Sequence, residues 1–197
     1  MTRISVDAKS LTTYGTAAEQ AFKGVRTELT GLVHSCTTVP YEGPNSAAFK
    51  NGCGKLATEF SASLLSDIGK FTDAVRDVTT GIARSLGGHP VTIHFNGSPI
   101  TAPAVPAADP NYTMVDTSPL HQLKSTVHGH FNKINAHLDE HLRAFQHAKW
   151  EGHAREAAHS ALRTFTSNTK SDVTQAQQHI EKFIDEQIQS VTTADQG

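Results

Sequence analysis

The sequence is poor in cysteine, tryptophan and long apolar runs. It has two cysteines, one tryptophan and 7% aromatic residues among 197 positions, and apolar residues make up 37%. No run approaches the roughly 18 apolar residues that a membrane-spanning helix needs, so no transmembrane segment is predicted. This composition suits long amphipathic helices whose outer faces stay in water, rather than a thick multilayer core.

An excess of positive charge is also missing. Lysine and arginine number 17 against 19 aspartate and glutamate residues, which gives a formal net charge of -2. Nucleic acids and anionic lipids both attract basic surfaces, so the sequence excludes nucleic acid as a partner and gives membrane contact no support. The first residues, Met1–Asp7, lack the apolar stretch of a secretory signal peptide. If the protein is exported, we expect a route that accepts leaderless proteins.

Catalytic motifs are absent from the sequence as well. There is no Gly-x-Ser-x-Gly, no glycine-rich phosphate loop and no cysteine/histidine array with zinc-ligand spacing. An enzyme needs a nucleophile with its base, an acid and base pair, or a metal with an open position. We therefore predict a protein that is not an enzyme, needs no cofactor and acts by binding other proteins.

Apolar positions instead recur every three or four residues along four long segments, as is typical of amphipathic helices. The first two segments form a predicted helical hairpin over residues 1–86, with a turn at residues 37–43. The stripe of the first helix consists of Leu11, Tyr14, Ala18, Phe22, Val25, Leu29, Leu32 and Cys36. The stripe of the second consists of Phe49, Cys53, Leu56, Phe60, Leu64, Ile68, Phe71, Val75, Val78, Ile82 and Leu86.

The last two segments repeat this plan over residues 119–197, with a turn at residues 149–152. The third stripe consists of Leu120, Leu123, Val127, Phe131, Ile134, Leu138, Leu142 and Phe145. The fourth consists of Ala158, Ala161, Phe165, Val173, Ala176, Ile180, Ile184, Ile188 and Val191. Each hairpin has one apolar face, and two such faces can bury each other. The predicted fold is all-α, with two antiparallel hairpins that form an intramolecular four-helix bundle.

The spacer between the hairpins, residues 87–118, has a different pattern. Val91, Ile93 and Phe95 alternate with polar residues, and Asn96-Gly97 is a strong turn signal. The spacer therefore predicts a short β-hairpin at residues 91–100, although Pro99 weakens its second arm. An extended, proline-rich linker follows.

Two aromatic-glycine pairs lie at the predicted turns. Trp150-Glu151-Gly152 separates the last two helices, and Tyr41-Glu42-Gly43 takes the corresponding place in the first hairpin. In both turns glycine supplies a backbone conformation closed to most residues, and the aromatic ring covers the end of the bundle. The motif and its placement resemble the WXG family of secreted helical hairpins, with tyrosine replacing tryptophan in the first copy.

The resemblance implies an all-helical protein exported by a bacterial type VII secretion system and acting as substrate, effector or chaperone. Family members usually work as dimers of hairpins, and here both hairpins share one chain. The implied partners are the secretion machinery or a cognate secreted protein. The implied location is the cytoplasm before export, then the medium or the cell surface. The alternative is a helical binding module that works inside the cell or on a membrane surface.

Family members or their partners often carry a Tyr-x-x-x-Asp/Glu export signal just after the second helix of a hairpin. Tyr112 and Asp116 match that string. They lie in the spacer, well past the second predicted helix, where an ordinary linker tyrosine is the alternative interpretation. No match follows the fourth helix, where Phe183 and Gln187 only echo the spacing.

Cys36 and Cys53 flank the first turn, so the hairpin brings them together. Their positions fit either a disulfide or two small buried thiols. An export destination would favour the disulfide.

Histidines are frequent in the third predicted helix, and His130, His137 and His141 lie on one side of it, beside the apolar stripe. The i, i+4 spacing of His137 and His141 could chelate zinc, copper or nickel. No glutamate lies between them in a His-Glu-x-x-His arrangement, so no metal is assigned. A polar face in water or at an interface is the favoured interpretation, and a pH sensor is a further hypothesis.

Overall fold

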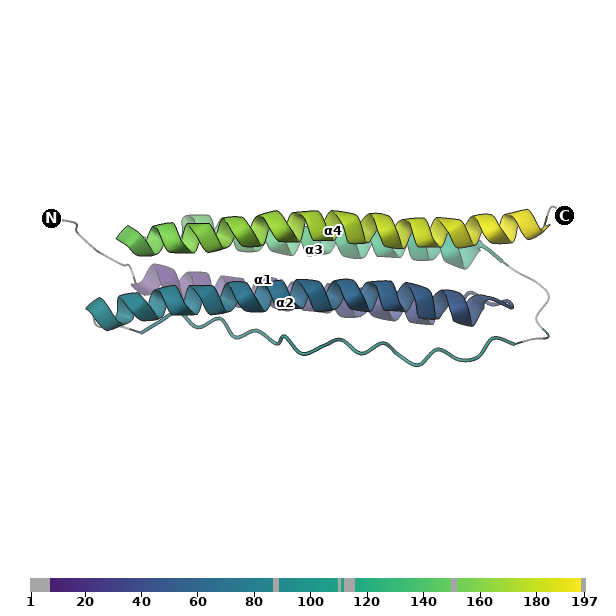
Figure 1. Cartoon of the computed structure of the whole chain (residues 1–197), viewed down its shortest axis with the longest axis horizontal. Coiled ribbons are helices and arrows are strands. Elements are labelled where there is room, and N and C mark those ends of the chain that lie inside the picture. The colour runs from purple at the N-terminus through teal and green to yellow at the C-terminus, as the bar shows by residue number, and fades with distance from the viewer. Residues whose placement is uncertain (1–7, 87–88, 110, 112–115, 150–151, 196–197) are drawn as a thin grey trace. The chain divides into compact units, whose positions relative to one another are not determined.

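The chain forms four helices separated by one long and two short connections (Figure 1). The computed structural model describes residues 8–86, 89–109, 111, 116–149 and 152–195. The helices are α1 (Ala8–Thr38), α2 (Ser46–Leu86), α3 (Ser118–His147) and α4 (Gly152–Asp195). They pack as a bundle, which confirms the predicted all-α, four-helix fold. None of these helices has a stretch apolar enough to cross a membrane.

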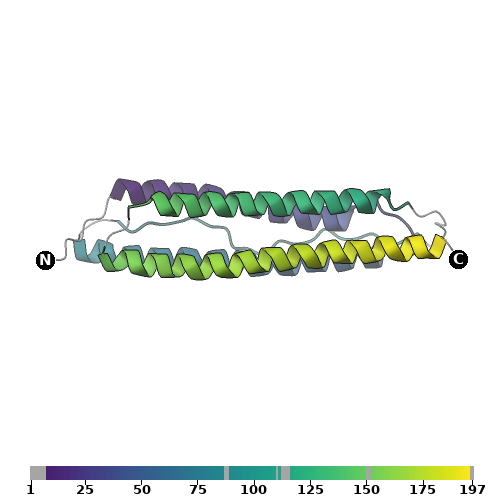
Figure 2. The ribbon, with the colours of Figure 1, turned by 90° about the horizontal axis from the view of Figure 1, so that it is seen from above.

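The residues fall into two compact units, each with its own core. Unit 1 consists of Met1–Arg26, Leu64–Ser98 and Asn135–Ser171. Unit 2 consists of Thr27–Ser63, Pro99–Ile134 and Asp172–Gly197. Each of the four helices contributes one segment to each unit. Figure 2 shows α3 and α4 as continuous ribbons. Each unit therefore draws on both predicted hairpins.

Four rings, one from each helix, form a cluster in the core of unit 1. Phe22 of α1, Phe71 of α2 and Phe165 of α4 surround the imidazole of His141 on α3. The ring centre of His141 lies 4.6 Å from that of Phe22, 4.9 Å from that of Phe71 and 5.7 Å from that of Phe165. Aromatic pairs at such distances are favourable beyond the area they bury, so this cluster joins all four helices of the unit.

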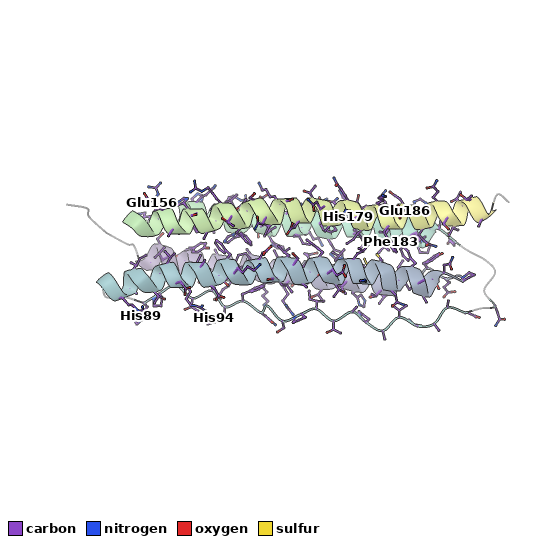
Figure 3. All side chains as sticks on the ribbon, in the orientation of Figure 1. His89, His94, Glu156, His179, Phe183 and Glu186 are labelled. Carbon is purple, nitrogen blue, oxygen red and sulfur yellow. The ribbon has the colours of Figure 1, made fainter. Side chains whose placement is uncertain are left out.

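The core of unit 2 is mainly aliphatic and also contains aromatic pairs. Phe60 of α2 and Phe131 of α3 have ring centres 5.3 Å apart. Phe49 of α2 stacks on Phe183 of α4, with a centre distance of 5.5 Å. Figure 3 labels Phe183. The buried aliphatic residues of this unit include Leu29, Leu32, Ile134, Ile180 and Ile184.

The predicted stripes become the buried faces of the helices, with local shifts. All eight stripe positions of α1 are buried. On α2, Leu56 is half-buried and the adjacent Ala57 takes the core position. The long gap in the α4 stripe is filled by Thr169, which is 2% exposed and whose hydroxyl donates to the carbonyl of Phe165. A threonine that bonds its own helix can occupy an apolar core at little cost.

The predicted β-hairpin at residues 91–100 is wrong, since the described residues contain no strand. The segment is extended, and helix side chains take the backbone bonds that a second strand would have taken. The N–H of Val91 donates to the hydroxyl of Thr79, and the N–H of His94 donates to the carboxylate of Glu19. The predicted turn at Asn96-Gly97 is not formed either, and within the extended segment the N–H of Ser98 donates to the side chain of Asn96.

Candidate functional sites

The first turn has the geometry that its aromatic-glycine pair predicts. Gly43 has a φ of 136°, a backbone conformation that side chains disfavour, and it is the one described residue with positive φ. Tyr41 is 2% exposed and packs edge-on against Phe49, with ring centres 5.6 Å apart. The ring of Tyr41 therefore covers the α1–α2 end of unit 2.

Side chains of α4 complete this cluster at the first turn. The side-chain amide of Gln187 donates to the hydroxyl of Tyr41 at 2.8 Å, and Phe183 stacks on Phe49. Phe183 also leaves no room beside Gly52, since a Cβ there would lie 2.6 Å from the ring. Of the two residues that echo the export spacing, Gln187 thus contacts the first turn and Phe183 contacts the start of α2.

The other motif residues are only partly described. Trp150 and Tyr112 lie outside the described residues, and Gly152 is the first residue of α4. Asp116 precedes α3, where its carboxylate accepts the N–H of Ser118 at 2.8 Å. Hydrogen bonds from the side chain and then the backbone of Ser118 lower the pKa of Asp116. This carboxylate therefore stabilises the start of α3.

Cys36 and Cys53 lie side by side in unit 2 as free thiols, each with 0% exposure. A hydrogen bond with Cys53 raises the pKa of Cys36, and burial raises it further. Beside them α1 and α2 approach closely, because a Cβ on Gly54 would collide with the methyl group of Thr37. The pair has the proximity that a disulfide requires, and the raised pKa of Cys36 disfavours the reactive thiolate form of that residue.

His141 is a core residue, which corrects its placement on a polar face. It is 1% exposed, and its Nε2 shares a hydrogen bond of 3.1 Å with the hydroxyl of Tyr14. Burial lowers the pKa of His141 to about 3 and raises the pKa of Tyr14. Both side chains are therefore neutral at physiological pH, and each satisfies the other's buried polar atom.

His130 occupies a different environment, in unit 2. Its Nδ1 donates to the carboxylate of Glu28 at 2.8 Å, and its Nε2 lies 3.4 Å from the hydroxyl of Ser35. The order serine, histidine, carboxylate is also that of a hydrolytic triad. However, Ser35 lies inside α1, where the N–H groups bond carbonyls one turn back and are not free to form an oxyanion hole. The contacts instead hold the half-buried ring with both nitrogens satisfied.

His137 completes the row of three histidines and has separate partners. In unit 1 its Nδ1 lies 3.0 Å from the carboxylate of Glu140 on the same helix, and its ring packs over Gly24. Among the described residues no three histidine, cysteine, aspartate or glutamate side chains gather as a metal site would require. The pairs of Glu28 with His130 and of Tyr14 with His141 join residues 102 and 127 positions apart, so helix periodicity could not reveal them.

We expect Gly31→Ala to destabilise the protein and Gly129→Ala to stabilise it. A Cβ on Gly31 would lie 2.5 Å from Cε1 of His130, whereas nothing lies within 4 Å of a Cβ on Gly129. Alanine favours a helix over glycine by about 1 kcal/mol, and Gly129→Ala should gain roughly that amount. Gly31→Ala should lose about 1–3 kcal/mol, because His130 must leave its partners. Urea unfolding of both variants measures the difference, and an equal gain in both would contradict the close approach of His130.

No protein-family model, curated protein or solved structure matches this chain.

Proposed function

We propose that this chain is a non-enzymatic protein exported by a type VII secretion system, and that it acts by binding other proteins as substrate, effector or chaperone. The observation that carries the proposal is the first turn. Gly43 has a positive φ, and the buried Tyr41 ring covers the end of unit 2. These are the two physical roles that the aromatic-glycine motif of the WXG family implies for its members.

The way that Tyr41 is held adds support for a functional role of this end of the unit. Gln187 donates to its hydroxyl, and Phe183 stacks on the neighbouring Phe49. The turn is therefore held against α4 as one ordered end of unit 2, as a motif with a defined structural role would be.

Export can be tested directly in a bacterium with a working type VII system. The chain is expressed with and without the secretion ATPase, and the culture medium is probed by immunoblot alongside a cytoplasmic protein that reports lysis. We expect the chain in the medium only when the ATPase is present. Retention of a folded, well-expressed chain in both strains would remove the proposal and favour a helical binding module that is not exported.

Single substitutions then separate the motif from the fold. Trp150→Ala and Tyr112→Ala should each lower export if these residues are recognised. Ser98→Ala, at an exposed spacer position, is the matched control and should leave export unchanged. Circular dichroism of each purified variant distinguishes loss of recognition from loss of structure.

A further inference from the structure

The extended segment at residues 91–98 occupies a strand-sized slot in unit 1. The slot is lined by Glu19 and Arg26 of α1 and by Thr79 of α2. Gly15 of α1 forms part of its floor, because a Cβ there would lie 3.1 Å from the side chain of Val91. The helices thus bind an extended segment that is not part of a sheet.

The side chains of the segment alternate as those of a strand do. Val91 and Ile93 are each 7% exposed, and Phe95 is half-buried with its ring centre 6.0 Å from that of Phe22. Between them, Thr92 and His94 are exposed, as Figure 3 shows for His94. The slot therefore accepts three apolar side chains at every second position, and the other side chains stay in water.

The backbone of the segment is bound along both edges. Thr79 of α2 accepts the N–H of Val91 at 3.0 Å and lies 3.4 Å from the carbonyl of the same residue. Glu19 of α1 accepts the N–H of His94 at 2.7 Å. Arg26 donates to the carbonyls of Asn96 and Ser98 at 2.8 and 2.7 Å.

These contacts follow the geometry of an extended chain, in which N–H and C=O groups of even and odd residues point to opposite edges. The even residues 94, 96 and 98 bond to α1, and the odd residue Val91 bonds to α2. Backbone contacts of this kind recognise the extended conformation, and alternate apolar pockets supply the selectivity.

We infer that this slot is a binding site for an extended polypeptide segment of another protein, with β-branched or aromatic residues at three alternate positions. Residues 91–98 are its tethered occupant. The tether gives them an effective concentration in the millimolar range, so a partner segment binds when the tethered segment is weakened or released. This inference rests on the proposed binding role and not on the proposed export route.

The test uses a fluorescent peptide that spans residues 89–98 and the full-length chain with Val91→Ala and Ile93→Ala. These changes weaken the tethered segment and leave the side chains of the slot intact. Fluorescence anisotropy should show that the peptide binds this variant at least about tenfold more tightly than it binds the parent. A peptide with aspartate in place of Val91 and Ile93 is the matched control and should not bind.

Changes in the slot itself complete the test. On the weakened chain, Arg26→Gln and Thr79→Val should each reduce peptide affinity about fivefold or more, since each removes backbone bonds. If the double alanine variant loses its helical circular dichroism, His94→Pro replaces it, because it removes the N–H bonded to Glu19 and leaves the apolar side chains in place.

Three results would overturn the inference. The folded, weakened chain could fail to bind the peptide at millimolar concentration, or it could bind the aspartate peptide equally well. Alternatively, light scattering could show that the weakened chain and the parent form mixed dimers that the peptide does not dissociate, which would assign the slot to exchange between copies of this chain. None of these results depends on secretion, so each is distinct from a failure of the export assay.

Discussion

Acidification from about pH 7 to about pH 4 should destabilise the protein steeply through one side chain, His141. The imidazole is 1% exposed, and burial lowers its pKa to about 3 from an ordinary value of 6.5. Above pH 6.5 the ring is neutral in both the folded and the unfolded chain, so its stability contribution is fully present. Below pH 6.5 the unfolded chain takes up a proton that the folded chain excludes, and stability is lost until the pH reaches about 3.

The size of this loss follows from proton linkage. Each pH unit within the window removes about 1.4 kcal/mol from the free energy of unfolding, so the loss near pH 4 is on the order of 3 kcal/mol. Carboxylates of the chain also titrate below pH 5, so the thermal midpoint of the parent alone does not isolate His141. The difference between the parent and a variant does isolate it.

His141→Phe keeps an aromatic ring in the cluster and removes the titrating group. At pH 7 this variant should be less stable than the parent by about 1–3 kcal/mol, because the buried hydrogen bond between the Tyr14 hydroxyl and His141 is lost. The difference in unfolding free energy between the parent and this variant should shrink and then change sign as the pH falls towards 4. His121→Phe, at an exposed position on the same helix, is the control and should show no such crossing. If the unfolding free energies of the parent and of His141→Phe fall in parallel as the pH is lowered, His141 is not the group that causes the loss of stability.

Oxidation should join Cys36 to Cys53 and stabilise unit 2. The two thiols contact each other and are fully buried. With oxidised glutathione as oxidant, the thiols lose two hydrogen atoms, the Cys36–Cys53 disulfide forms and two reduced glutathione molecules leave. Closing a loop of roughly 15 residues stabilises a protein by about 3 kcal/mol, which corresponds to a rise in the thermal midpoint of about 6–12 °C.

The reaction should be slow in the folded protein. Burial and the hydrogen bond to Cys53 raise the pKa of Cys36, and thiol exchange requires the thiolate. A low concentration of urea should therefore accelerate the reaction by opening unit 2. Mass spectrometry of the tryptic peptides detects the bond, and Cys53→Ala is the control that should gain no stability from oxidant. A bond that forms without raising the thermal midpoint would mean that it strains the packing of α1 against α2.

Helix periodicity predicted the fold because each helix has one continuous apolar face. The spacing by threes and fours on α1 selects the residues that are buried, from Leu11 to Cys36. The first turn was equally predictable, since Pro40 and Gly43 interrupt the pattern and only glycine readily adopts a φ of 136°. The sequence determined the disulfide and metal hypotheses less well, because the spacing of residues along the chain does not show which side chains come into contact in the fold.

In the third helix, periodicity alone does not decide which residue is buried. Starting from Leu138, both His141 and Leu142 continue a spacing of threes and fours to Phe145, so the pattern admits either residue in the core. The structure buries His141 and leaves Leu142 half-buried. The rings of Phe22, Phe71 and Phe165 surround the imidazole, and Tyr14 satisfies its nitrogen. These partners come from the other three helices, so the choice depends on tertiary packing.

The sequence by itself determined four amphipathic helices, their breaks and the alternation of residues 91–95, because these properties depend on neighbours within a few positions. Only the tertiary structure decided which histidine is buried, which side chains bond Tyr41 and what lies against the extended segment. That segment reads as a β-hairpin locally, yet Glu19, Arg26 and Thr79 bind its backbone from the helices. Buried backbone N–H and C=O groups need hydrogen-bond partners. In this segment the partners are residues distant in the chain, so the local sequence could not identify them.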